Sequence, residues 1–396
     1  MSNDELIMNP MVDLHIHPAP QAYPIDVARV ETISVKCPVR GRGLVIHELG
    51  RASPLFGFFA ELLTRGGELE LDSDAAQVAA LVELGFLITE AELVDWPQFR
   101  VPLPDGAACE GSGWIVAPHV RYQADFALHP AIRWPADYDE QDGRLRCFAP
   151  GPALWVGDPA VFTSPYWLTG AQATQLAALV PGAPPPPLPA ALTAALVAVG
   201  ALVRASAPEI PSRFAAELAA YRRDGHAIAR DFLPAAELAA LRRYYTALLD
   251  GDLVQLGDRQ LRARYSTYND PIGRFVHARL APVMAALVGA PVLPSFCYFF
   301  SYLPGAALAP HKDRAQAEFS ISLQLDHHPA PDGATGWPLG FTFDDGRAAS
   351  ADLGLGDAVL YHGRAIRHHR APLPADQRSS VLVFEYVPAD FAGLVI

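Results

Sequence analysis

The feature that most constrains the fold is a series of short apolar segments toward the C-terminal end of the chain. Short segments that are rich in aromatic and β-branched residues and are bounded by Pro, Gly and Asp are typical of strands. Several such strands in succession indicate a β-sandwich or a small barrel. The segments are SFCYFFSYL (295–303), EFSISLQL (318–325), LGFTFDD (339–345), DAVLYHG (357–363) and SSVLVFEYV (379–387).

Helical patterns precede these strands from about residue 212. The segments RFAAELAAYRRDG (213–225) and DFLPAAELAALRRYYTALLDGD (231–252) have the apolar spacing of amphipathic helices. Pro234 suits the first turn of the second helix. We therefore expect a C-terminal domain, residues 212–396, in which helices lead into a β-structure.

Two segments of the N-terminal half resemble each other. One begins SPLFGFFAELL at Ser53 and the other SPYWLTGAQATQL at Ser164. Each continues through two apolar helical segments to a glycine, Gly85 or Gly200, that suits a helix C-cap. The similarity indicates a duplicated helical module.

The order of helix, turn, helix and short strand predicts a winged-helix type of module. We expect a mainly helical region, residues 1–205, with modules at about 44–90 and 153–205. Winged-helix modules bind DNA or peptides, but a fold does not determine a function. The modules are therefore interpreted either as a docking site for a peptide or protein substrate or as a scaffold.

Composition narrows the classes of partner and compartment. The 396 residues are 51% hydrophobic, which favours more than one domain, and the net charge of −13 disfavours nucleic acid and anionic membranes. The start MSNDELIMNP lacks a secretion signal, and no apolar run is long enough to span a bilayer. Four separated cysteines suggest neither a zinc site nor a disulfide framework, so a cytoplasmic protein is expected. They are Cys37, Cys109, Cys147 and Cys297.

A potential metal site lies in the strand-rich region, in the segment APHKDR. His311 and Asp313 are two residues apart, so on an extended chain both side chains leave the same face. With one further histidine they form the two-histidine, one-carboxylate set typical of non-haem Fe(II) oxygenases. The segment LYHGRAIRHHR offers His362, His368 and His369 as the third ligand.

These motifs resemble a known superfamily. The HxD motif, the HHR run after the strand GDAVLY and a basic residue ten positions after His368 are similar to Fe(II)/2-oxoglutarate-dependent dioxygenases of the prolyl-hydroxylase-like group. The resemblance covers about residues 222–391. It implies a double-stranded β-helix, or jelly roll, with flanking helices, and hence an α+β protein.

The resemblance also implies roles for individual residues. His311, Asp313 and His368 would bind iron, and Arg378 and Tyr302 would bind 2-oxoglutarate. Since adjacent residues of a strand face opposite sides, His368 and His369 cannot both reach the metal.

The expected reaction is hydroxylation of an unactivated C–H bond in a peptide or protein side chain, with dioxygen as co-substrate and ascorbate as a reductant. Arg314 and Arg370 lie next to the ligands in sequence, so each is a candidate to hold the substrate or to form an ion pair at the rim of the barrel. Asp313 excludes iron halogenases, which need a small residue there. Two alternatives remain: a hydroxylase of a free amino acid or secondary metabolite, and a non-enzymatic, cupin-like metal or ligand sensor.

Overall fold

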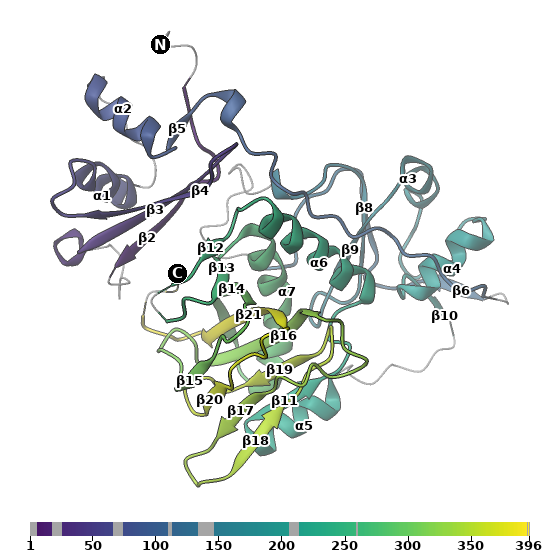
Figure 1. Cartoon of the computed structure of the whole chain (residues 1–396). Coiled ribbons are helices and arrows are strands. Elements are labelled where there is room, and N and C mark those ends of the chain that lie inside the picture. Colours follow the sequence, from purple (N-terminus) through teal and green to yellow (C-terminus); the bar gives the residue numbers. More distant parts are fainter. Residues whose placement is uncertain are drawn as a thin grey trace.

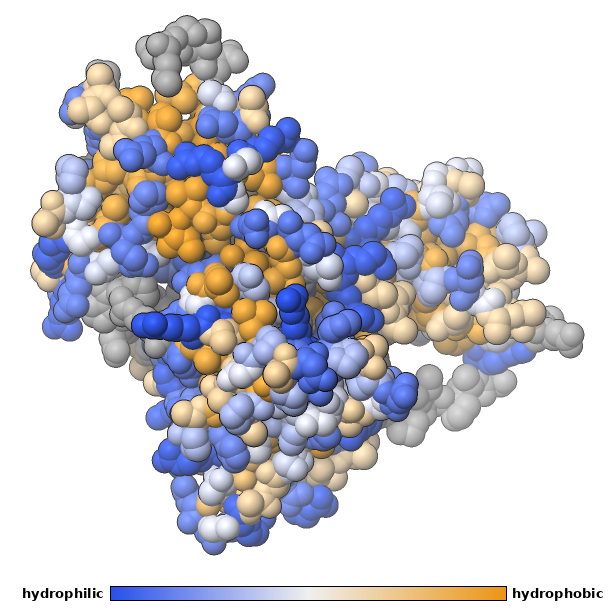
Figure 2. Space-filling view, viewed as in Figure 1, coloured by the Kyte–Doolittle hydropathy of each residue, from blue (hydrophilic) through white to orange (hydrophobic). Residues whose placement is uncertain are grey.

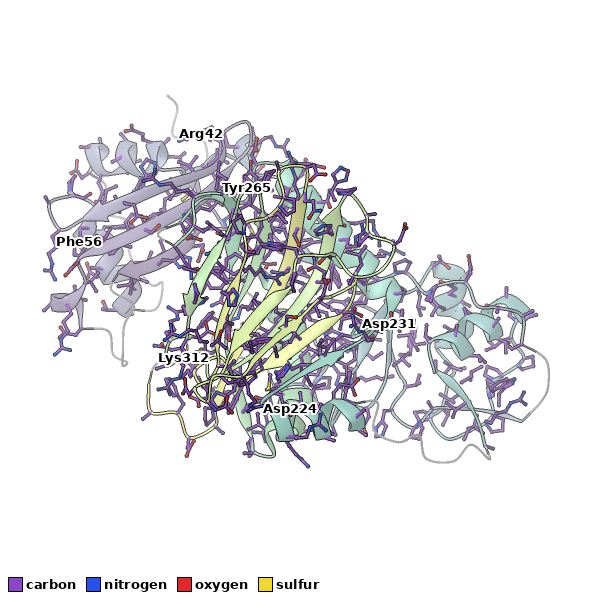
Figure 3. All side chains as sticks on the ribbon, turned by 60° about the horizontal axis from the view of Figure 1, so that its bottom comes forward. Arg42, Phe56, Asp224, Asp231, Tyr265 and Lys312 are labelled. Atoms are coloured by element: carbon purple, nitrogen blue, oxygen red, sulfur yellow. The ribbon has the colours of Figure 1, made fainter. Side chains whose placement is uncertain are left out.

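The computed structural model of the chain describes residues 6–17, 26–65, 74–109, 113–133, 146–205, 214–258, 260–393 and 395. Figure 1 shows three parts: a first module, a second module and a β-barrel with its helices. Viewed from another direction, the two modules again flank the barrel on opposite sides (Figure 3).

The barrel consists of two antiparallel sheets. The larger has the strand order β11-β19-β16-β21-β14-β13-β12 and the smaller the order β15-β20-β17-β18. From β14 onward the chain passes back and forth between them, with β14, β16, β19 and β21 in the larger sheet and β15, β17, β18 and β20 in the smaller. This alternation is the double-stranded β-helix expected from the sequence. The larger sheet comprises β11 (His226–Ala229), β12 (Gln255–Leu256), β13 (Arg264–Tyr268), β14 (Val292–Tyr302), β16 (Phe319–His328), β19 (Ala358–Tyr361) and β21 (Arg378–Pro388). The smaller comprises β15 (Leu308–His311), β17 (Leu339–Thr342), β18 (Ala348–Ala351) and β20 (Arg367–Arg370).

Three helices accompany the larger sheet: α5 (Ala215–Asp224), α6 (Ala235–Asp250) and α7 (Pro271–Val288). The start of α7 is well defined because Asp270 accepts hydrogen bonds from the backbone N–H groups of Ile272 and Gly273. Its long buried face packs against β14 and β21. In the described part of the chain, no helix has the length and apolarity needed to cross a membrane.

The two modules have the same order of elements and the same strand pairing. In each, a three-stranded meander precedes two helices, and the first strand pairs with the strand after the second helix. The first module contains β1 (Ile7–Met8), β2 (Asp13–His17), β3 (Thr32–Val39), β4 (Gly43–Gly50), α1 (Phe56–Arg65), α2 (Ala75–Glu83) and β5 (Leu87–Ile88). The second contains β6 (Trp114–Val116), β7 (Arg121–Gln123), β8 (Ala153–Val156), β9 (Ser164–Trp167), α3 (Gly170–Leu176), α4 (Ala190–Ala198) and β10 (Leu202–Arg204).

These modules differ from the sequence expectation in two respects. The N-terminal half is not mainly helical, because each module contains five strands and two helices, and the winged-helix assignment is not confirmed. Ser164 lies inside β9 whereas Ser53 lies beyond β4, so the two Ser-Pro pairs are not equivalent. Gly85 and Gly200 do correspond, since each follows the second helix of its module with φ of 75°. Residues 66–73 of the expected first module lie outside the described residues.

Hydrophobic packing separates the first module from the rest. One continuous core runs from Phe99 in the chain before the second module to Tyr386 in the barrel, while the first module has its own core around Phe59. Aromatic rings join the second module to α7, where Phe148 lies 4.9 Å from Phe275 between ring centroids. A domain boundary between residues 205 and 212 would therefore divide a single core.

Candidate active site

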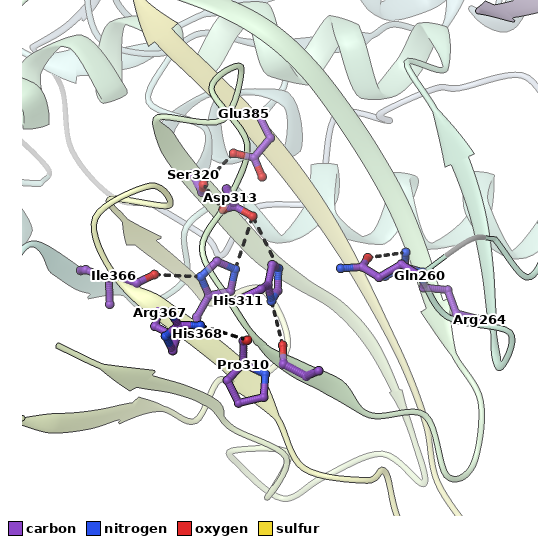
Figure 4. Close-up of polar contacts among 11 residues, drawn as sticks. Gln260, Arg264, Pro310, His311, Asp313, Ser320, Ile366, Arg367, His368 and Glu385 are labelled. Atoms are coloured by element: carbon purple, nitrogen blue, oxygen red, sulfur yellow. Dashed lines mark hydrogen bonds and ion pairs between the residues drawn. The ribbon is translucent and has the colours of Figure 1, made fainter. Parts of the chain in front are cut away.

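Three of the predicted side chains converge inside the barrel (Figure 4). His311 ends β15, Asp313 follows it, and His368 lies on β20 directly opposite His311 in the strand register. The Oδ1 atom of Asp313 lies 3.6 Å from Nε2 of His311 and 3.5 Å from Nε2 of His368. All three potential ligand atoms lie within 4.8 Å of one another, so they can share one metal ion.

Hydrogen bonds orient both imidazole rings toward that point. Nδ1 of His311 donates to the carbonyl of Ala309 at 2.9 Å, and Nδ1 of His368 donates to the carbonyl of Ile366 at 3.1 Å. Each Nε2 lone pair is thereby left facing Asp313, as metal-ligating histidines require. Burial, with a contribution from His368, lowers the pKa of His311 and favours the neutral ring that binds metal. The donor set fits Fe(II).

Asp313 is positioned by Gly363, in the turn after β19, and by Ser320 of β16. Its backbone N–H donates to the carbonyl of Gly363 at 3.0 Å, and its Oδ2 lies 3.4 Å from Ser320 Oγ. A Cβ atom on Gly363 would lie 2.3 Å from Asp313 Oδ2, so glycine is required there. Ser320 also donates to Glu385 Oε2 at 2.6 Å, and burial together with the charge of Asp313 raises the pKa of Glu385 well above its usual range.

Glu385 also belongs to this site, although it was not among the residues predicted from the sequence. The residue is 4% exposed and faces the same cavity as the three ligands. The sequence does contain a hint of its role, because Glu385 is the single acidic residue within the apolar strand VLVFEYV. A carboxyl group buried in such a strand needs a polar partner.

A cavity of about 330 Å³ lies between the two sheets at the three ligands. Tyr302, the candidate for binding the co-substrate, and Arg314 and Arg370, the candidates for holding the substrate, line this cavity. Arg314 is exposed and stacks on Phe296, with its guanidinium carbon 4.1 Å from the ring centroid. Arg370 is buried. A further arginine, Arg264, was not foreseen; it is 3% exposed and paired with Asp258 at 2.6 Å.

Arg378 is not at this cavity, contrary to the prediction that it binds the co-substrate. Its side chain is exposed and lines a separate hollow with Asp326 and His328. The reason is strand alternation: Val381 and Glu385 of β21 face the cavity, so residue 378 faces the opposite side.

The two alternative histidines also lie away from the three ligands. The ring of His369 packs against Gly340 on β17, where a Cβ atom added to the glycine would lie 2.7 Å from the Nε2 atom of the ring. His362 follows β19 and pairs with Glu318, 3.3 Å from Nε2 to the carboxylate. Of the three histidines considered as the third ligand, the structure brings His368 to His311 and Asp313.

Comparison with known proteins gives matches among solved structures. No family model and no curated protein sequence matches the chain. The non-heme alpha-ketoglutarate-dependent epimerase SnoN from nogalamycin biosynthesis is 19% identical over 46% of this chain and 84% of its own, with a TM-score of 0.38. A prolyl-4-hydroxylase from Pseudomonas putida is 17% identical over 44% of this chain and 98% of its own, with a TM-score of 0.37.

A third match is described as an oxidoreductase of the 2OG-Fe(II) oxygenase family from Burkholderia pseudomallei. It is 19% identical over 45% of this chain and 91% of its own, with a TM-score of 0.35. At these low identities and scores, the fold is established by the strand connectivity of the barrel, and the chemistry must be argued from its side chains.

Proposed function

We propose that the chain is an Fe(II)- and 2-oxoglutarate-dependent oxygenase that hydroxylates an unactivated C–H bond. The observation that carries this proposal is the convergence of His311, Asp313 and His368 on one point inside the barrel. Two imidazoles and one carboxylate leave coordination positions open, which is the pattern of non-haem Fe(II) oxygenases. When bound, iron with 2-oxoglutarate and dioxygen supplies oxidation of the C–H bond, with succinate and carbon dioxide as co-products.

The chain itself supplies orientation and exclusion of water. The backbone carbonyls of Ala309 and Ile366 fix the two imidazoles, and Gly363 leaves room for the Asp313 carboxylate. Aromatic side chains from β14, including Tyr298 and Phe300, form one wall of the cavity. A reactive centre enclosed in this way is protected from side reactions with solvent.

Turnover of the full chain tests this function. Purified protein with Fe(II), 2-oxoglutarate, dioxygen and ascorbate should release succinate and carbon dioxide in equal amounts. His368→Ala should abolish the release, because one imidazole ligand is lost, whereas His369→Ala should keep the metal site. Full activity of His368→Ala would contradict the assignment, and absence of succinate under every substrate tested would favour the sensor alternative.

The substrate we propose is a peptide or protein side chain, and a second cavity supports this choice. A cavity of about 390 Å³ lies between the first module and the barrel, lined by residues 10–14 at the start of β2 and residues 266–271 at the end of β13. Among the described strands, β2 pairs with β3 alone and its other edge is open. An open strand edge is a template for an extended peptide.

The second cavity adjoins the cavity of the metal ligands. Tyr268 lines the second cavity, and its ring lies 4.8 Å from Tyr298 and 5.9 Å from Phe296 between centroids. Both of these rings line the cavity of the metal ligands. Figure 2 shows apolar side chains on the first module that continue to its junction with the barrel. An extended substrate bound at this junction would be separated from His311, Asp313 and His368 only by the aromatic side chains of Tyr268, Phe296 and Tyr298.

A search for oxidised products separates the substrate classes. Peptide and small-molecule fractions from cells that express the protein should be compared with those from cells that express His368→Ala. A gain of one oxygen in a peptide supports the proposal, whereas a product confined to small metabolites favours the alternative hydroxylase. With the peptide in hand, Met11→Trp, which fills the second cavity, should raise KM, and Ile46→Trp on the exposed face of β4 should not.

A further inference from the structure

A serine hydroxyl lies between the carboxyl groups of Asp313 and Glu385 (Figure 4). Ser320 Oγ is 3.4 Å from Asp313 Oδ2 and 2.6 Å from Glu385 Oε2. Ser320 on β16 and Glu385 on β21 are partners in the strand register, and both side chains are buried. The three groups therefore form a connected chain that two adjacent interior strands of the larger sheet hold in place.

The contact with Ser320 involves the oxygen of Asp313 that is not the one nearest the imidazoles. Oδ1 lies 3.6 Å from Nε2 of His311 and 3.5 Å from Nε2 of His368. Oδ2 lies beside Ser320, and a Cβ atom on Gly363 would be 2.3 Å from it. A carboxylate whose second oxygen is held in this way binds a metal ion through one oxygen. The remaining coordination positions then stay open for the co-substrate and dioxygen.

The hydrogens of this chain can be counted from its chemistry. An aspartate that binds a metal ion is ionised and only accepts hydrogen bonds, and a serine hydroxyl carries a single hydrogen. Ser320 can therefore donate to Asp313 only while its contact with Glu385 uses a hydrogen on the Glu385 carboxyl group. Among the residues that the structure describes, no Lys or Arg forms an ion pair with Glu385. Because an unpaired buried charge is costly, the neutral carboxyl group is favoured there.

We propose that Ser320 and Glu385 are positioning residues for the metal site: in the metal-loaded protein Glu385 donates to Ser320, and Ser320 donates to Oδ2 of Asp313. This inference rests on the proposed function, because it requires that Asp313 binds Fe(II). Glu385 acts here as a neutral hydrogen-bond donor and not as a fourth ligand or a counter-charge to the metal. Its effect on Asp313 passes through Ser320, so it depends on the hydrogen bond and not on the charge of the side chain.

The Mn(II) affinity of the full chain, measured by calorimetry, tests this role without turnover. Ser320→Ala should weaken Mn(II) binding about 10- to 100-fold, because Oδ2 of Asp313 loses its donor. Glu385→Met, which is similar in size but has no hydrogen to donate, should weaken binding in the same range. Glu385→Gln should keep the wild-type affinity, since its amide N–H donates to Ser320 as the neutral carboxyl group does. The matched control is Ser322→Ala, a buried serine of the same strand that lines the same cavity, and it should also keep the wild-type affinity.

The outcomes separate this inference from the function on which it rests. If wild type does not bind Mn(II), the proposed function fails, and this inference fails with it. If wild type binds Mn(II) but Ser320→Ala binds it equally well, or Ser322→Ala weakens binding as much as Ser320→Ala does, the positioning role alone is overturned. If Glu385→Gln binds Mn(II) as weakly as Glu385→Met, Glu385 acts through its negative charge and the hydrogen-bond chain is overturned.

The melting temperatures of the metal-free variants show whether the fold is intact. If Glu385→Met does not fold, Glu385→Asp replaces it, because its shorter side chain withdraws the carboxyl group from Ser320 by one methylene. Glu385→Asp should then bind Mn(II) more weakly than Glu385→Gln although it keeps an acidic group, and the opposite order would overturn the proposal.

Discussion

The joint between the second module and the barrel can be tested by mutation of a buried ion pair. Glu237 of α6 and Arg279 of α7 form an ion pair in which both side chains are 0% exposed. Ser164 of β9 donates to Glu237 Oε2 at 2.8 Å, and Arg279 Nη1 donates to the carbonyl of Thr163 at 2.6 Å. One network therefore holds two helices and the second module, and removal of one charge leaves the other buried without a partner.

The expected effect of Arg279→Met is large. Breaking a buried pair on one side costs about 3–5 kcal/mol, because the remaining charge loses its partner without regaining water. The guanidinium also stacks on Phe275, 4.2 Å from its centroid, a contact that methionine replaces in part. The free energy of unfolding, measured with urea at equilibrium, should fall by that amount. The double variant Arg279→Met with Glu237→Leu should recover most of it, since neither charge remains.

The matched control is an exposed ion pair. Arg223 and Asp224 are paired at 2.7 Å at the end of α5, and Arg223→Met should leave stability unchanged within error. The reasoning is refuted if Arg279→Met unfolds with a free energy within about 1 kcal/mol of wild type, or if the double variant is no more stable than the single one.

Three further changes test other parts of the structure. Gly363→Ala places a methyl group 2.3 Å from Asp313 Oδ2, so affinity for Mn(II) should fall about 10- to 100-fold in a calorimetric titration. Gly340→Ala brings Cβ within 2.6 Å of the His369 ring and should lower the melting temperature while Mn(II) affinity stays at the wild-type value. Burial lowers the pKa of His277 from 6.5 to about 3, so its contribution to stability is present above pH 6.5 and is lost toward pH 3. Comparison of wild type with His277→Gln should show this loss as about 1.4 kcal/mol per pH unit in the free energy of unfolding.

The sequence predicted the features that depend on local spacing. The separation of His311 and Asp313 on an extended chain is a local property, and so is the sequence of apolar segments that form the barrel. The strands of the modules were missed for a physical reason. Segments such as Thr32–Val39 and Ala153–Val156 are buried on both faces, so they lack the alternation that distinguishes a strand from a helix.

Features that depend on register could not be predicted. Arg378 has the expected distance in sequence from His368, but the loop between β20 and β21 decides which face of β21 enters the cavity. Arg264 and Glu385 reach the cavity from strands whose neighbours are fixed only in the folded sheet. Short-range motifs therefore predicted the three residues that converge in the barrel, and the residues around them required the structure.

The two modules share a topology but differ in how they meet the barrel, and this difference bears on their roles. The second module gives Ser164 to the Glu237–Arg279 network and shares one hydrophobic core with α7. The first module keeps a separate core and meets the barrel across a cavity that residues 10–14, Lys36 and Leu44 line on its side. Of the two copies, the first therefore lines a cavity that shares an aromatic wall, through Tyr268 and Tyr298, with the cavity of His311, Asp313 and His368.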